Sequence, residues 1–342
     1  MKQKITILIC ILVSLAMLLS INLANTAWAG EAKKAITLKI ICSKPKGDEA
    51  ALPGLWLSER FNERAKGKVF LHYVGGPEVV PEKEQLEAVR TGVVDIVNTV
   101  GAFYKSAVPE VGNVQSLSPL LPWEEREKGI YDFYNQFMQK KANVYFLGKP
   151  QGGTGFYLYL GKPGVRVKRL ADMKGLKIRV SGTYVAFVKA LDAVPISMPK
   201  GEVYTAMERG VVDGFGFPAV GTFPCDFDMI KYRIDHSFYQ NESTMLVNLD
   251  TWKKLPKDMQ ELLIEVEKEV ERDIIPRRQK QLAEVTKQLT DAGCNLLRFP
   301  GDEGKRYVQL AYEGRWKETE ALTSPEYVAK LRKLFGKTMP EW

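Results

Sequence analysis

A single arginine has the setting of an anion-binding residue. Arg179 lies near the end of a short predicted strand, residues 175–180, among apolar residues that are typical of a protein interior. A buried guanidinium needs an anionic partner, and its planar fork of donors matches a carboxylate in a bidentate arrangement. That partner is either an acidic side chain of the protein, which would make Arg179 structural, or the carboxylate of a ligand. The residue alone leaves both open.

The chain contains few residues that are suited to catalysis. Only two histidines occur, His72 and His236, which excludes a histidine-rich metal site or a paired-histidine relay. Cys225 could act as a nucleophile beside His236, but no pattern brings the two together. The Gly-Gly-Thr-Gly stretch at residues 152–155 lacks the Gly-Lys-Ser/Thr that completes a phosphate loop. We therefore expect no enzyme, no cofactor and no bound metal.

The first thirty residues predict export. Two lysines precede an apolar run over residues 5–23, and the Ala-Trp-Ala of residues 27–29 places small side chains where a signal peptidase reads them. We predict a signal peptide over residues 1–29 that is cleaved, which places the mature protein in the periplasm. The alternative is an uncleaved anchor, but polar residues at positions 14, 20 and 22 interrupt the run of about 20 apolar residues that it needs.

The composition is that of a folded protein with a mixed surface. The chain has 342 residues, 45% hydrophobic and 26% charged, with a net charge of +8, and this length favours two lobes. Basic residues are interleaved with acidic ones, so we expect no binding to nucleic acid. Cys42, Cys225 and Cys294 permit one disulfide but no framework. Which cysteines pair, and whether the protein is a monomer or a homodimer, stays open.

Strands and helices alternate along two stretches of the chain. Residues 36–42 predict a strand, residues 52–65 an amphipathic helix and residues 69–74 a second strand. A second set of strand, helix and short strand follows at residues 175–180, 184–191 and 196–198. Such alternation is typical of a parallel sheet with helices on its faces. We therefore predict an α/β fold with two such units.

A near-repeat relates the two units. Residues 84–95 and 202–213 share the pattern Glu-x-x-x-Ala-x-x-x-Gly-Val-Val-Asp without a gap. A helix that ends at a left-handed glycine, followed by a Val-Val pair that starts a strand, explains the pattern. Ligands of open parallel sheets bind beyond the carboxyl ends of the strands. The residues after these two strands, 98–100 and 215–218, are therefore expected to approach one crevice.

The chain after residue 248 is predicted to be mainly helical. Pro256 is expected to start a helix that continues to Ile275, and Pro276 to kink it before residues 277–292 continue. At 1.5 Å per residue such a helix is about 50 Å long, enough to cross both lobes and serve as a spring or hinge.

Several motifs together resemble the solute-binding proteins of TRAP (tripartite ATP-independent periplasmic) transporters, the DctP family. They are residues 84–95, 121–122, 170–180, 198, 202–206, 210–214, 218, 246–248, 252 and 255–256. The resemblance implies a two-lobed α/β periplasmic binding protein, a venus flytrap with the long kinked helix shared by both lobes. Lobe I would comprise residues 30–155 and 246–284, and lobe II residues 156–245 and 285–342.

The resemblance also implies a function. Lobe closure would capture a small organic acid, the arginine at position 179 would clamp its carboxylate, and small and large membrane subunits would take the acid up. The alternative is a receptor of the same fold that presents a carboxylate to a sensor protein.

Departures from the family pattern bear on the ligand. Some members carry a second arginine about twenty residues before the first, whereas residues 155–159 contain none here, so a second fixed positive charge is expected to be missing. In the family's Asp-Gly-x-Glu-x-Pro segment, Gly216 replaces the glutamate and Phe217 replaces a polar residue. The lost glutamate weakens the case for a metal beside the ligand. One arginine and an aromatic pocket indicate an apolar or aromatic monocarboxylate.

The expected ligand contacts combine one arginine, three rings and two hydroxyl groups. They are Arg179, Phe217, Tyr157, Tyr159, Thr99 and Ser43. The arginine would hold the carboxylate, and Phe217 with one of the two tyrosines would contact the body of the ligand. A hydroxyl group from the opposite lobe would add a hydrogen bond. Phe217 is expected on the loop that follows its strand.

Overall fold

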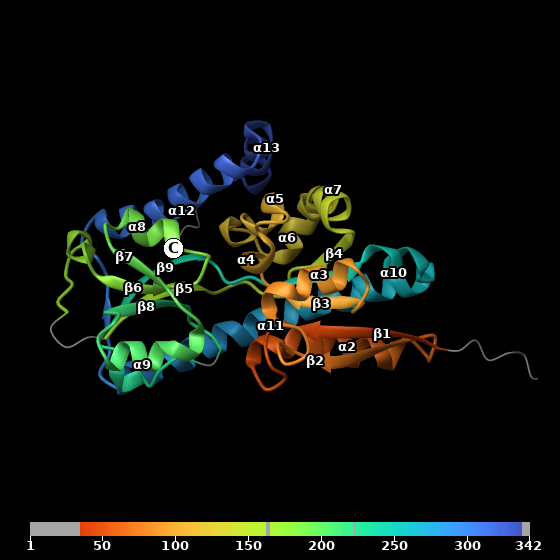
Figure 1. The fold of residues 1–342 in the computed structure, drawn as a ribbon, viewed down its shortest axis with the longest axis horizontal. Helices are drawn as coiled ribbons and strands as arrows, with labels where there is room; N and C mark the ends of the chain where they lie inside the picture. The colour runs from red at the N-terminus through yellow and green to blue at the C-terminus, as the bar shows by residue number, and fades with distance from the viewer. Residues whose placement is uncertain (1–34, 162–164, 222, 337–342) are drawn as a thin grey trace, which may run out of the picture. The chain divides into compact units, whose positions relative to one another are not determined.

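Two β-sheets organise the computed structural model, which describes residues 35–161, 165–221 and 223–336 (Figure 1). The predicted signal peptide lies outside these ranges. In strand order, sheet A contains β2 (Val69–Gly75), β1 (Ile36–Cys42), β3 (Ile96–Thr99), β10 (Thr244–Asn248) and β4 (Val144–Gly148). Sheet B contains β11 (Asn295–Leu297), β9 (Tyr232–Gln240), β5 (Gly155–Leu160), β8 (Gly214–Pro218), β6 (Lys177–Val180) and β7 (Val194–Ser197).

The predicted strand and helix units are present in both sheets. Helix α2 (Leu52–Arg64) connects β1 with β2, and α8 (Val185–Ala190) connects β6 with β7. The buried side of α2 includes Leu57 and Phe61, which pack in one cluster with Ile40 of β1. The alternating apolar pattern therefore predicted these elements to within a few residues, because burial of one helix face specifies its period.

The sheets are mixed and not wholly parallel as the alternation suggested. β1 with β3, and β6 with β7 and β8, pair in parallel, but β10 runs antiparallel to β3 and β4, and β5 antiparallel to β8 and β9. β4 leads directly into β5, and β9 into β10, so both antiparallel strands enter from the other sheet. Such a strand starts at the end where its neighbours finish, and its direction is therefore reversed.

The near-repeat forms two equivalent helix-to-strand junctions. Helix α3 (Gln85–Arg90) precedes β3, and α9 (Val203–Glu208) precedes β8. The glycines at positions 92 and 210 have φ values of 78° and 63°, the left-handed conformation that the pattern predicted. The Val-Val pair does not start the strand, however, because each first valine is exposed and β3 begins only at Ile96. Residues 98–99 and 215–218 accordingly lie within the strands.

The aspartates that end the two repeats make the same hydrogen bond in each sheet. Asp95 Oδ2 accepts a hydrogen bond of 2.8 Å from the backbone N–H of Lys39 in β1. Asp213 Oδ2 accepts a hydrogen bond of the same length from the N–H of Lys177 in β6. Each aspartate thus fixes the start of its strand against the neighbouring parallel strand.

The long helix is a single element, α11 (Lys257–Asp291), with Pro276 inside it (Figure 1). Its 35 residues correspond to about 50 Å. Leu263, Val266 and Val270 pack with strands of sheet A, whereas Leu289 packs with Tyr157 and Tyr159 of sheet B. The helix therefore contributes to the hydrophobic core beside each sheet, as the two-lobed fold requires.

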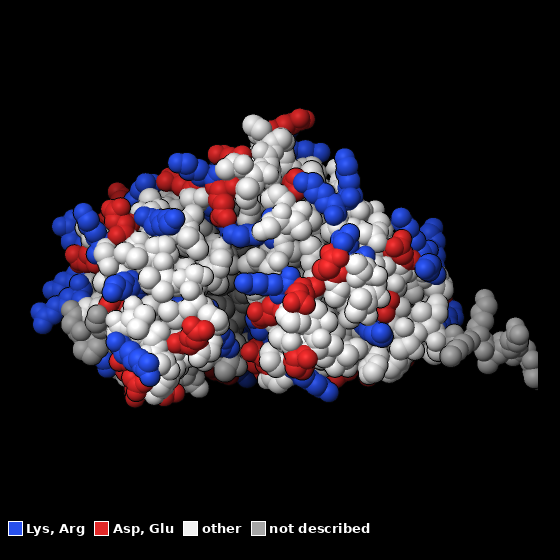
Figure 2. All heavy atoms as spheres, viewed as in Figure 1, with Lys and Arg blue, Asp and Glu red and all other residues white. Residues whose placement is uncertain are grey.

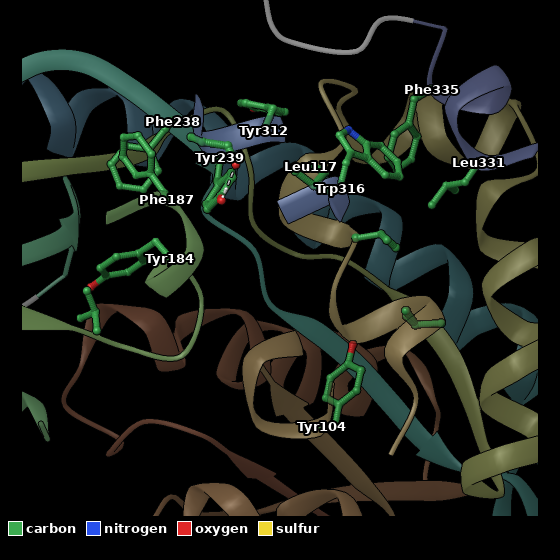
Figure 3. Close-up of a cluster of buried hydrophobic side chains, with 14 of the residues drawn as sticks. Tyr104, Leu117, Tyr184, Phe187, Phe238, Tyr239, Tyr312, Trp316, Leu331 and Phe335 are labelled. Atoms are coloured by element: carbon green, nitrogen blue, oxygen red, sulfur yellow. Dashed lines mark hydrogen bonds between the residues drawn. The ribbon is translucent and has the colours of Figure 1, made fainter. Parts of the chain in front are cut away.

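The remaining helices complete the layers. They are α4 (Gly101–Tyr104), α5 (Pro109–Gly112), α6 (Pro122–Glu127), α7 (Ile130–Ala142), α10 (Leu249–Lys254), α12 (Glu303–Leu322) and α13 (Pro325–Phe335). Figure 3 shows side chains of α12 and α13 in one large aromatic cluster, in which the hydroxyl of Tyr239 donates a hydrogen bond of 2.8 Å to the carbonyl of Ala311. Tyr327 of α13 stacks on Phe133 of α7 with ring centroids 5.3 Å apart.

The surface of this fold is mixed in charge. Figure 2 shows lysines and arginines interspersed with acidic residues over the face that it draws. Within the ranges that the structure describes, no helix combines the length and the apolar character needed to cross a membrane.

Candidate functional site

Arg179 is a buried cation without an acidic partner among the described residues. It lies in β6 and is 6% exposed. Its Nε and Nη2 donate to the carbonyl of Met198 at 3.1 and 3.0 Å, and Nη1 lies 3.5 Å from the carbonyl of Gly216. Two backbone carbonyls orient the guanidinium but do not neutralise it. The site therefore retains a positive charge and unused N–H donors.

Gly216 leaves room for a tyrosine behind this arginine. A Cβ atom at position 216 would lie 2.2 Å from Cε2 of Tyr184, far inside a normal contact. The hydroxyl of Tyr184 donates a hydrogen bond of 2.5 Å to the carbonyl of Gly216, the same carbonyl that Arg179 approaches. Figure 3 shows Tyr184 in the aromatic cluster on this side of the sheet. A side chain at position 216, such as the glutamate of the family pattern, would need the space that the Tyr184 ring occupies.

The three predicted rings lie on one face of sheet B but at different depths. Tyr157 pairs with Phe217, and Tyr159 with Phe215, across β5 and β8. Tyr159 has no exposed surface and stacks on Phe215 at 5.2 Å. Tyr157 is 8% exposed, with the guanidinium of Arg233 4.7 Å from its ring centroid. Phe217 is only partly buried, and it belongs to strand β8 and not to the following loop as expected.

Ser43 and Thr99 lie side by side in sheet A. Ser43 directly follows β1 and Thr99 ends β3, and the N–H of Ser43 donates a hydrogen bond of 2.8 Å to Asn98. Both side chains are almost fully buried, and the Oγ1 atom of Thr99 has no hydrogen-bond partner within the described chain. A buried hydroxyl without a partner at the carboxyl end of a strand is suited to a polar ligand group.

Two polar contacts connect the strand ends of the two sheets. Lys200 Nζ lies 3.8 Å from Asp48 Oδ2, shortly after β1. Lys105, which follows α4, donates 3.0 Å to the carbonyl of Gly182 after β6, and 2.8 Å to Glu318 of α12. The segments that follow β1 and β3 in sheet A therefore contact those that follow β7 and β6 in sheet B.

Two further cations of this region, Lys44 and Lys200, were not predicted from the sequence. Lys200 Nζ lies 5.5 Å from the ring centroid of Phe217, and Lys44 Nζ lies 5.4 Å from that of Phe103. Lys44 is also paired with Glu82. The absence of a second ligand-binding cation stays a prediction, but two lysines, Lys44 and Lys200, lie in the neighbourhood. Both lysines lie just beyond predicted strands, which could have indicated a place near the site. We had interpreted such charged residues as solvated surface.

Within the described ranges, no group of side chains is suited to binding a metal ion or to thiol chemistry. No set of three or more His, Cys, Asp or Glu side chains there could hold a metal ion. Cys42, Cys225 and Cys294 are free and buried. Burial raises the pKa of Cys42 to about 11 and that of Cys225 to about 12, so both remain protonated thiols at neutral pH.

Known proteins that resemble this chain belong to one family. The profile of bacterial extracellular solute-binding proteins of family 7, DctP, matches residues 45–318. The monocarboxylate 2-oxoacid-binding periplasmic protein of Nostoc sp. (strain PCC 7120) is 25% identical over 255 residues, which cover 72% of this chain and 69% of that protein.

Solved structures share the fold at low sequence identity. A TRAP periplasmic solute-binding protein of Desulfovibrio salexigens with bound orotic acid has a TM-score of 0.73 and 18% identity, covering 89% of this chain and 99% of that one. An extracytoplasmic solute receptor of Bordetella pertussis that binds pyroglutamic acid has a TM-score of 0.71 and 16% identity, covering 89% and 100%. With the family profile covering most of the chain, this protein belongs to the DctP family of TRAP periplasmic solute-binding proteins, which bind solutes and are not enzymes.

Proposed function

We propose that this protein captures an organic acid with an apolar or aromatic body in the periplasm and delivers it to the small and large membrane subunits of a TRAP transporter. The observation that carries the proposal is the buried guanidinium of Arg179, which is oriented by two carbonyls and lacks an acidic partner in the described chain. A carboxylate would complete it, because a buried cation is stable only when it is paired.

The neighbouring residues suit the rest of such a ligand. The partly buried Phe217 directly follows Gly216, whose carbonyl Arg179 approaches, and Tyr157 lies opposite it on the neighbouring strand. Ser43 and Thr99 offer hydroxyl groups from sheet A. Relatives are named for organic acids: the Nostoc protein for monocarboxylate 2-oxoacids, and the two structures for pyroglutamic and orotic acid.

Lobe closure is the proposed mechanism of capture. The acid first binds one lobe, and closure then brings the strand ends of sheets A and B together around it and excludes water. The lobe boundaries that we propose, at residues 155/156, 245/246 and 284/285, fall within β5, β10 and α11. The closed form is the form that the membrane subunits would recognise.

The Arg179→Met variant tests the clamp. Calorimetric titration of ligand-stripped protein with aryl or branched monocarboxylates, dicarboxylates and sugar acids identifies the class that binds. For that class we expect Arg179→Met to lose at least roughly thirtyfold in affinity, about 2 kcal/mol, because the ligand carboxylate would be buried without its cation. Arg179→Lys should recover part of the loss, since it restores the charge but not the fork.

Arg209→Met, at the exposed end of α9, is the matched control and should bind as the wild type does. Thermal melting without ligand checks that each variant is folded. Unchanged affinity of a folded Arg179→Met variant would contradict the clamp. Binding confined to dicarboxylates or sugar acids would contradict the apolar monocarboxylate class.

A further inference from the structure

A second cation stands beside the proposed carboxylate site. Lys200 opens the 3-10 turn η5 (Lys200–Glu202), two residues after Met198, whose carbonyl holds the guanidinium of Arg179. Its Nζ lies over the ring of Phe217, which is in the same strand as the other carbonyl acceptor, Gly216. Lys200 and Arg179 thus both approach the segment Gly216–Phe217, which holds the ring that we assign to the body of the ligand.

The ammonium group of Lys200 has unused donor capacity. Its contact with Asp48 is 3.8 Å, too long for a hydrogen bond, and no other acceptor within the described residues binds its Nζ. The Asp48 carboxylate also caps η1 (Glu49–Ala51), where Oδ1 accepts 2.9 Å from the N–H of Ala50. Lys200 is only about one-third exposed, with a side-chain exposure of 36%.

The charged groups around Lys200 are of both signs. Burial lowers the pKa of Lys200; Lys44 and Arg179 add to the lowering, while Asp48 and Glu82 oppose it. Lys44, unlike Lys200, has a close carboxylate partner in Glu82. An anionic or electron-rich oxygen of a ligand that reaches both Arg179 and Lys200 would use the free donors of both.

We propose that Lys200 is a second ligand-binding residue, which donates a hydrogen bond to an oxygen of the ligand other than the carboxylate held by Arg179. The ligand class is thereby narrowed to monocarboxylates with a second oxygen acceptor near the carboxylate, such as a 2-oxo group. This inference rests on the proposed function, since it assumes that Arg179 and Phe217 contact the acid. It makes Lys200 a specificity-determining residue.

Matched acid pairs and a Lys200→Met variant test the inference. Calorimetry compares 2-oxo-4-methylpentanoate with 4-methylpentanoate, and phenylpyruvate with 3-phenylpropanoate. We expect the wild type to bind the member with the second acceptor at least about tenfold more tightly, as a charge-assisted hydrogen bond implies. In Lys200→Met that preference should disappear, while the affinity for the simple monocarboxylate stays within about threefold.

The controls separate the two proposals. Lys46→Met removes an exposed lysine on the segment after β1 and should leave the preference unchanged. A preference that persists in Lys200→Met, or an equal loss for both members of every pair, would overturn the role of Lys200 even if Arg179→Met abolishes binding. If none of the acids binds the wild type, both proposals are overturned.

Discussion

At the scale of single residues, the site depends on glycine as much as on charge. Gly216 was identified from the sequence only as a departure from the family pattern. The structure supplies the reason for it: the ring of Tyr184 fills the space that a side chain would need, and its hydroxyl binds the carbonyl that also faces Arg179. The backbone behind the guanidinium is therefore held by a buried aromatic residue.

Gly216→Ala should destabilise the protein. The added Cβ would meet three atoms of the Tyr184 ring at 2.2 to 3.0 Å, and a buried ring cannot move aside cheaply. Overpacking of this kind costs about 1–3 kcal/mol, so we expect a lower melting temperature without ligand. Gly201→Ala is the control, because a Cβ there meets nothing within 4 Å. Equal melting temperatures for the two variants would contradict this account of Gly216.

At the scale of elements, α11 stabilises two cores at once. Its first half packs Leu263, Val266 and Val270 into the cluster beside sheet A, and its last turns pack Leu289 beside sheet B. Polar contacts add to this: Arg278 is buried and donates 2.7 Å to the carbonyl of Glu49 in η1. The sequence predicted that this helix starts at Pro256 and continues beyond Pro276, because prolines mark helix starts and interruptions.

Leu263→Ala measures how much the first half of α11 contributes. Leu263 has no exposed surface, so its truncation leaves a cavity in the sheet A cluster. We expect the free energy of unfolding in urea to fall by about 2–5 kcal/mol. Leu322→Ala, at the end of α12 where the side chain is 53% exposed, should change it by less than about 0.5 kcal/mol. Similar losses for both would show that α11 does not anchor this core.

At the scale of the whole molecule, the chain crosses between the sheets through β4–β5 and β9–β10, and charged residues lie buried in these connections. Glu242, between β9 and β10, is 6% exposed and accepts a hydrogen bond of 3.1 Å from the N–H of Gly101. Burial raises its pKa to about 7, although Gly101, Lys149 and Arg315 lower it and Glu125 raises it further. The segment between the sheets therefore contains a titratable group.

Glu242 should make stability depend on pH. Its folded pKa lies above the unfolded value of about 4.3, so the folded state binds more protons between these values. The contribution of Glu242 to stability is therefore complete below pH 4.3 and is lost as the pH rises to about 7. Urea unfolding from pH 4.5 to 8 should show a flatter profile for Glu242→Gln than for the wild type. The exposed Glu63→Gln control should keep the wild-type slope, and a Glu242→Gln profile parallel to the wild type would contradict the assignment.

What could be predicted from the sequence was local. The strands and helices around residues 36–74 and 175–198, the left-handed glycines of the near-repeat and the strand position of Arg179 all follow from short-range periodicity and turn chemistry. The motifs also identified the DctP family correctly. Errors arose where direction or distance along the chain mattered: the sheets were expected to be parallel, and Phe217 was expected on a loop.

The sequence by itself thus determined the elements, the family and one cation suited to a carboxylate. Only the tertiary structure decided that Arg179 has no acidic partner in the described chain, that Tyr159 stacks on Phe215, and that Lys200 lies over Phe217. The physical reason is that a residue's burial depends on its own segment, whereas its partners depend on how the chain crosses between the two sheets. No local pattern encodes that crossing.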